Sequence, residues 1–192
     1  KVYADGLYEF VWRDFCDWYL EAIKPTIQGS GAQRRVLATV TDVILRLLHP
    51  VMPYVTEALW GHLNEAAADR GLDGLETPPA ELLARAAWPA GDDRYDDPRA
   101  EADFGLLADV VTAIRKTRTA YKVSPRQPLA CSATAPPEAA DRLTEHAPVL
   151  CALAGASGFD AGPHVPRPMP PRSLPPSPRR LRHRRHCSFI SS

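Results

Sequence analysis

The most constraining feature of this sequence is a highly aromatic segment, residues 7–24, which has the spacing of an amphipathic helix. Its apolar side chains recur every three or four residues in two adjacent rows, and charged side chains occupy the opposite side. So many large rings on one face predict burial against other helices, and this spacing favours core packing over stacking on nucleobases. Pro25 should end the helix, because proline has no amide hydrogen and clashes with the preceding turn. The rows contain Leu7, Tyr8, Val11, Trp12, Phe15, Trp18, Tyr19, Ala22 and Ile23.

Two more helices are predicted, over about 33–48 and 53–67, where apolar residues recur with the same helical period. The loops between the helices are short, so neighbouring helices should pack in broadly antiparallel fashion. Asp42 and Arg46 are four residues apart, and we expect them to form an ion pair on the outer face of the second helix.

The rest of the chain is less regular. Residues 69–97 are rich in glycine and proline, with one short helix expected near 80–87. A long helix follows at about 99–121, with Phe104, Leu107, Val111 and Ile114 on its inner face. A strand at 129–135, a helix at 136–146 and a further turn at 149–153 should then open a small α/β part.

Charge and cysteine usage narrow the possible functions. The net charge of zero hides a split, because residues 1–162 hold 16 Lys and Arg against 23 Asp and Glu, whereas 163–192 hold seven Arg and no acid. Any contact of the folded part with RNA must therefore use a local basic patch. The four cysteines form no Cys-x-x-Cys pair, which argues against a metal site and suits a reducing cytoplasm. No apolar stretch reaches the length needed to span a membrane.

Four segments together resemble the C-terminal anticodon-binding region of valyl-tRNA synthetase, a class I aminoacyl-tRNA synthetase. The resemblance covers roughly residues 1–159, and the Asp17-Trp18-Tyr19 core favours the valyl over the isoleucyl or leucyl enzyme. The segments are Tyr8 to Pro25, Leu47 to Trp60, Trp88-Pro89, and Val111 to Arg118 with the turn at Val123-Ser124-Pro125.

The resemblance implies a mainly α fold: a helical bundle of the anticodon-binding type, then the start of a small α/β junction domain. The tail departs from the family, and its proline-rich composition predicts disorder. The expected divisions are a bundle core at 1–68, a loop-rich connection at 69–98, the long helix with the start of the junction at 99–162, and a basic Pro-rich tail at 163–192. The tail either is genuine or arises from a shifted reading frame. Because the chain opens at Lys1 without a methionine, we expect it to be a fragment.

The implied role is to dock a tRNA, that for valine, within an enzyme that attaches valine to its tRNA at the expense of ATP. No class I catalytic signature or phosphate-binding loop is present, so no catalytic residue, metal site or cofactor is expected in this chain. ATP and magnesium would act in the catalytic domain, which is absent here along with the editing domain. The alternatives are a fragment of the isoleucyl or leucyl enzyme, a free-standing RNA-binding module and a purely structural bundle.

The best RNA-binding candidates lie at the basic end of the long helix. Arg115, Arg118 and Lys122 recur at helical spacing, so we expect them to share a face that follows phosphates. Lys116 and Arg126 add to the same basic cluster. Arg34 and Arg35, after the glycine-containing linker, are weaker candidates. Cations at a helix C-terminus also need no ligand, since the helix dipole favours them there. In the tail, the arginine cluster at 179–185 would bind any polyanion without specificity.

Overall fold

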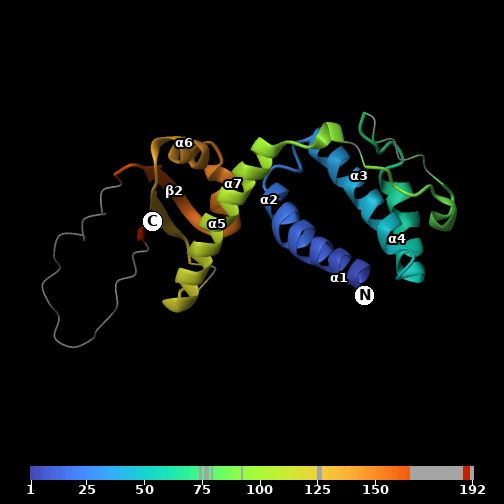
Figure 1. Ribbon diagram of the computed structural model, residues 1–192, viewed down its shortest axis with the longest axis horizontal. Coiled ribbons are helices and arrows are strands. Elements are labelled where there is room, and N and C mark those ends of the chain that lie inside the picture. Colours follow the sequence, from blue (N-terminus) through green and yellow to red (C-terminus); the bar gives the residue numbers. More distant parts are fainter. Residues whose placement is uncertain are drawn as a thin grey trace, which may run out of the picture. The chain divides into compact units, whose positions relative to one another are not determined.

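A computed structural model (Figure 1) describes residues 1–73, 75, 78, 80–91, 93–124 and 127–164, together with the backbone of 188–190. The chain divides into two compact units, Lys1–Asp96 and Asp97–Ser192. The first is helical and the second combines helices with a small sheet, so the expected fold class is confirmed. Nearly all of the basic tail falls outside the described residues.

The aromatic segment forms one continuous helical stretch, made of α1 (Val2–Glu9), the π-helix η1 (Phe10–Leu20) and α2 (Glu21–Ile23). It stops just before Pro25, as predicted. The predicted burial is found only in part: Tyr8 and Trp12 are 64% and 61% exposed, and no residue of the stretch is fully buried. The row of Leu7, Val11, Phe15, Trp18 and Ala22 is half-buried, so the exposed rings belong to the adjacent row. The rings stack instead along the helix, as Tyr8 on Trp12 and Phe15 on Tyr19.

The next two helices form the core of the first unit. Helix α3 (Gly31–Leu48) begins at Ser30, whose side-chain oxygen accepts a hydrogen bond from the amide of Gln33. Helix α4 (Pro53–Ala66) begins at a proline, which suits the first helical turn because its amide would have no partner there. The two helices lie side by side (Figure 1), and Leu45 and Trp60 pack together between them.

The segment after α4 completes this core. Its described residues include two short 3-10 helices, η2 (Leu83–Arg85) and η3 (Asp93–Tyr95). The first of these lies where a short helix was expected, near 80–87. Leu83 joins the cluster of Leu45 and Trp60. The Glu57 carboxylate accepts hydrogen bonds from the amides of Leu83 and Ala84, and so fixes the start of η2 against α4.

A buried ion cluster replaces the expected outer-face pair of Asp42 and Arg46. Asp42 is 0% exposed and Arg46 4%, because Arg70, Pro78 and Ala87 lie against this side of α3. Arg46 Nε donates to Asp42 Oδ1 at 2.5 Å, and Arg70 Nε donates to Oδ2 at 2.7 Å. Both guanidinium groups also lie over the Trp60 ring, 4.9 Å and 4.6 Å from its centroid. We call Asp42, Arg46, Arg70 and Trp60 the ion cluster.

The ion cluster also binds the loop that covers it. Arg46 donates to the carbonyl groups of Pro78 and Ala87, and the Trp60 indole donates to that of Ala80. Arg70 donates to the Asn64 side chain, so the cluster reaches α4 as well. One carboxylate, two cations and one ring thus join α3, α4 and a loop that has little regular structure of its own.

The second unit is built on the long helix α5 (Pro98–Ala120). Asp97 caps it, accepting hydrogen bonds from the amides of Arg99 and Ala100. Leu107, Val111 and Ile114 are buried as predicted, whereas Phe104 is 42% exposed. Strands β1 (Leu129–Thr134) and β2 (Ala156–Gly162) are parallel neighbours, with the backbone of β3 (Ser188–Ile190) on the other edge of β1. Helices α6 (Pro137–Glu145) and α7 (Ala147–Ala154) form the crossover that parallel strands require.

Candidate nucleic-acid interface

Helix α5 ends in a left-handed cap that is formed by Lys122. The Val123 amide donates to the Arg118 carbonyl at 2.8 Å, and the Lys122 amide donates to the Thr119 carbonyl at 3.1 Å. This pair of bonds is the Schellman motif, whose capping residue must adopt a positive φ and is usually glycine. Lys122 has φ 53°, and among the described residues no other non-glycine has positive φ. A cationic side chain therefore stands where a helix normally has none.

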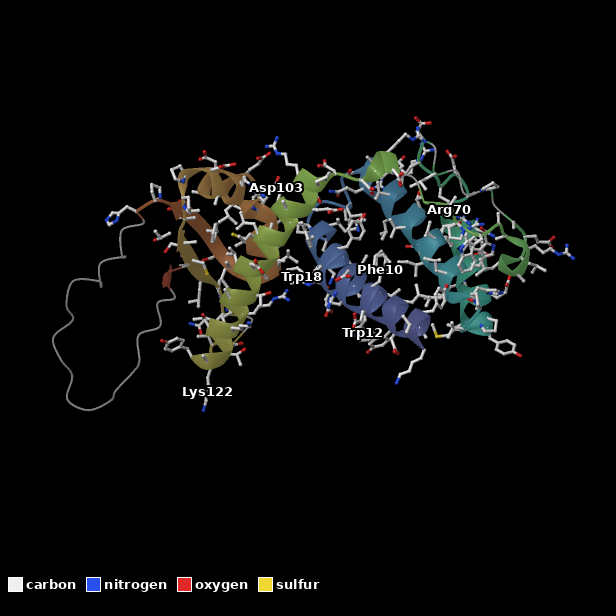
Figure 2. All side chains as sticks on the ribbon, in the orientation of Figure 1. Phe10, Trp12, Trp18, Arg70, Asp103 and Lys122 are labelled. Carbon is white, nitrogen blue, oxygen red and sulfur yellow. The ribbon has the colours of Figure 1, made fainter. Side chains whose placement is uncertain are left out.

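Three cations are exposed at this end of α5. They are Arg115 and Lys116 in the last two helical turns and Lys122 in the cap, and together we call them the basic end. The Lys122 side chain extends away from the ribbon at the tip of the helix (Figure 2). These residues combine positive charge with exposure, which are the two properties that a phosphate-binding surface needs.

Arg118 does not belong to this surface. Its side chain is 4% exposed, so the expected face of Arg115, Arg118 and Lys122 is not formed. Arg118 Nη1 donates to the carbonyl groups of Ser124 and Gln127, and Nη2 donates to that of Gly155. Helical spacing placed Arg118 on the same side as Arg115, but Ser124, Gln127 and the end of α7 lie against Arg118 and bury it. Arg118 is therefore a structural residue.

Arg115 is partly engaged as well. One of its terminal nitrogens donates to the Leu153 carbonyl at 2.9 Å, in the last turn of α7. The unpaired carbonyl groups of a helix C-terminus carry partial negative charge, so α7 attracts this cation without any ligand. Lys116 and Lys122 are consequently the stronger phosphate candidates. Arg126 lies outside the described residues.

Arg34 and Arg35 are exposed but are used to close loops. Arg34 donates to the carbonyl groups of Ile27 and Gln28, in the turn between α2 and α3. Arg35 Nε donates to the Gly71 carbonyl at 2.7 Å and so holds the loop after α4. Each residue keeps its charge at the surface, yet each already has a structural role.

The described residues offer little for catalysis. Among them, no three His, Cys, Asp or Glu side chains come together in a way that would hold a metal ion. Burial raises the pKa of the Cys151 thiol, which keeps it protonated and weakly nucleophilic at neutral pH. His49 Nδ1 lies 2.9 Å from the Thr56 hydroxyl, which itself donates to the Met52 carbonyl, so this histidine ties α3 to the start of α4.

Sequence reasoning found the basic end but missed its geometry. The signal for the Schellman motif is weak here, because a lysine occupies the position where glycine or asparagine normally marks it. Arg70 was missed altogether, since nothing in the irregular sequence around it indicates a partner 28 residues earlier. Both residues depend on contacts between segments that local periodicity does not report.

Comparison with known proteins assigns the family. Residues 1–134 match the family described as "Anticodon-binding domain of tRNA ligase". The chain is 42% identical over 127 residues to a valine–tRNA ligase of Thermosynechococcus vestitus, and 41% identical over 157 residues to one of Caulobacter vibrioides. It is 32% identical over 166 residues to one of Rhodopirellula baltica.

These alignments cover 64%, 79% and 83% of the chain, respectively, but only 13% to 16% of each relative. In the part of the chain that the structure describes, no helix combines the length and apolar character that crossing a bilayer demands. The matched region includes α1 to α5, the basic end and β1. The chain therefore belongs to the anticodon-binding domain family of tRNA ligases.

Proposed function

We propose that this chain binds the anticodon arm of the tRNA for valine, as part of a valine–tRNA ligase. The family match over residues 1–134 carries this proposal, and the valine-specific part rests on the three relatives, which are all valine–tRNA ligases. The Asp17-Trp18-Tyr19 sequence in η1 also favours the valyl over the isoleucyl or leucyl enzyme. The protein would act in the cytoplasm.

The basic end supplies the electrostatic part of the proposed interaction. Exposed cations on phosphates position an RNA without reading its sequence, and bases in a loop are read by other side chains. The remainder of residues 1–162 is acidic on balance, so attraction must be concentrated where the cations gather. Lys116 and Lys122 are assigned the phosphate contacts, with Arg115 in support.

The chemistry of aminoacylation is assigned elsewhere. This chain has no ATP-binding signature, so ATP and magnesium would act in a catalytic domain of the longer enzyme. The isolated chain should then contribute tRNA binding but no activation of valine.

The proposal is tested by the salt dependence of RNA binding. The full-length chain is used with its seven tail arginines changed to Gln, because these would otherwise bind any polyanion. Changing Lys122 to Gly should flatten the slope of log Kobs against log salt concentration by about 0.7–0.9, since one phosphate contact is lost. Glycine is chosen because it adopts the left-handed cap without strain, so the fold should be kept or stabilised by about 1 kcal/mol. Fluorescence anisotropy of a labelled valine tRNA measures the binding.

Lys24→Ala is the matched control. It removes one exposed lysine charge from the other compact unit, and the salt slope should not change. If Lys122→Gly and Lys116→Ala, singly and together, leave the slope of a folded protein at its original value, the basic end is only solvated and the proposed interface is wrong.

A further inference from the structure

The buried residue Arg118 is linked to the surface through the cap that holds Lys122. Its backbone carbonyl accepts the Val123 amide bond that closes the Schellman motif. Its guanidinium donates to Ser124 and Gln127, which lie on the chain immediately beyond Lys122. Arg118 therefore bonds the chain at the cap through its backbone carbonyl and the chain after the cap through its guanidinium.

The same guanidinium reaches a third segment. Arg118 Nη2 donates at 2.7 Å to the carbonyl of Gly155, the left-handed residue that ends α7 before β2. The loop after α5 is therefore tied to the C-terminal end of α7 as well as to its own helix. Arg115 donates to the neighbouring Leu153 carbonyl, so two successive turns of α5 are fixed to the same helix end.

These contacts lead to an inference that rests on the proposed function. We propose that Arg118 is a positioning residue for RNA binding: it holds the backbone at Val123, Ser124 and Gln127, so that the Lys122 ammonium projects from the end of α5 toward a phosphate. Arg118 is itself buried and touches no RNA. The proposed role depends on the geometry of the guanidinium rather than on its charge. Its planar fork points N–H donors in fixed directions, toward carbonyl groups of separate segments.

Changing Arg118 to Lys distinguishes the effect of the positive charge from the effect of the guanidinium geometry. Arg118→Lys keeps the positive charge but has a single terminal nitrogen, which cannot reproduce the fork. It should flatten the salt slope by most of the amount that Lys122→Gly removes. Arg118→Gln should do the same if the protein folds, and where it does not, Arg118→Lys alone decides.

A double-mutant cycle gives the sharpest test, and it is done in the full-length chain with the seven tail arginines changed to Gln, so that the tail cannot mask the contact. If Arg118 acts through Lys122, then Lys122→Gly should change the salt slope in the wild-type background but hardly at all in Arg118→Lys. A merely structural role predicts additive effects, with the full Lys122→Gly change in both backgrounds. The RNA used is the valine tRNA transcript, and circular dichroism confirms that each variant is folded.

Lys116→Ala serves as the internal control, because Lys116 precedes the cap and should lose its own contact in either background. A normal effect of Lys122→Gly together with an unaltered slope in Arg118→Lys would overturn the positioning role alone. No effect of Lys122→Gly in any background would instead overturn the proposed phosphate contact.

A measurement without RNA follows the turn itself. Val123 is buried, so the Lys122–Val123 peptide bond should resist trypsin in the native chain. Arg118→Lys should speed cleavage at this bond, measured by mass spectrometry, while cleavage after Arg94, an exposed residue of the first unit, keeps its rate. An unchanged rate at Lys122 would show that Arg118 does not hold the turn.

Discussion

Replacing Asp42 with Ala should destabilise the first unit by about 3–5 kcal/mol, because two buried guanidinium groups lose their only shared carboxylate. Two like charges would then lie buried beside the Trp60 ring without the carboxylate that both contact. All four tryptophans lie in the first unit, so urea unfolding followed by tryptophan fluorescence reports on this unit.

Asp14→Ala is the matched control. Asp14 also accepts from an arginine, Arg13, but both side chains are largely exposed, and the unfolding midpoint should stay where it is. An Asp42→Ala protein that unfolds at the wild-type urea concentration would show that water reaches the ion cluster. The burial of α3 beneath the 70–87 segment would then be wrong.

Replacing Trp60 with Ala should cost about 3–5 kcal/mol, since its side chain is fully buried and its removal leaves a large cavity. The loss includes the stacking of two cations and the hydrogen bond to the Ala80 carbonyl. The same urea titration measures it, with the remaining tryptophans as the probe.

Trp12→Ala is the informative comparison. Trp12 is mostly exposed, so its loss should change the free energy of unfolding by no more than about 0.5 kcal/mol. From the sequence alone, Trp12 is expected to be a core residue with a cost like that of Trp60. If Trp12→Ala and Trp60→Ala both lowered the free energy of unfolding by a similar, large amount, Trp12 would be a core residue as the sequence predicts. That result would contradict the exposure of Trp12 in η1.

The helix positions were predictable because local signals fix them. Pro25 stops the first helix, Pro53 starts α4, and the apolar rows of α3 and α5 appear directly in the sequence. The burial of polar residues was not predictable in this way. Asp42 and Arg46 have the spacing of a surface pair, and only the covering segment, which lacks any regular pattern, puts them inside.

At the candidate interface, too, the helix could be predicted from local signals, but the burial of a polar residue could not. Composition and helical spacing correctly indicated cations at the end of α5, but periodicity counted Arg118 among the surface residues. Its burial depends on Ser124, Gln127 and Gly155, which are 6 to 37 residues away in the sequence. In the aromatic stretch the predicted spacing holds for the half-buried row, but spacing alone did not show that Tyr8 and Trp12, in the adjacent row, are exposed.

Competition between two RNA hairpins tests the central claim most directly. A labelled valine tRNA is bound to the full-length chain with its tail arginines changed to Gln, and unlabelled hairpins of equal length are added. An anticodon-binding domain should release the tRNA to the valine anticodon stem-loop and much less readily to a hairpin of the acceptor stem. Equal displacement by both hairpins, or by neither, would contradict the assignment of this chain to anticodon-arm recognition.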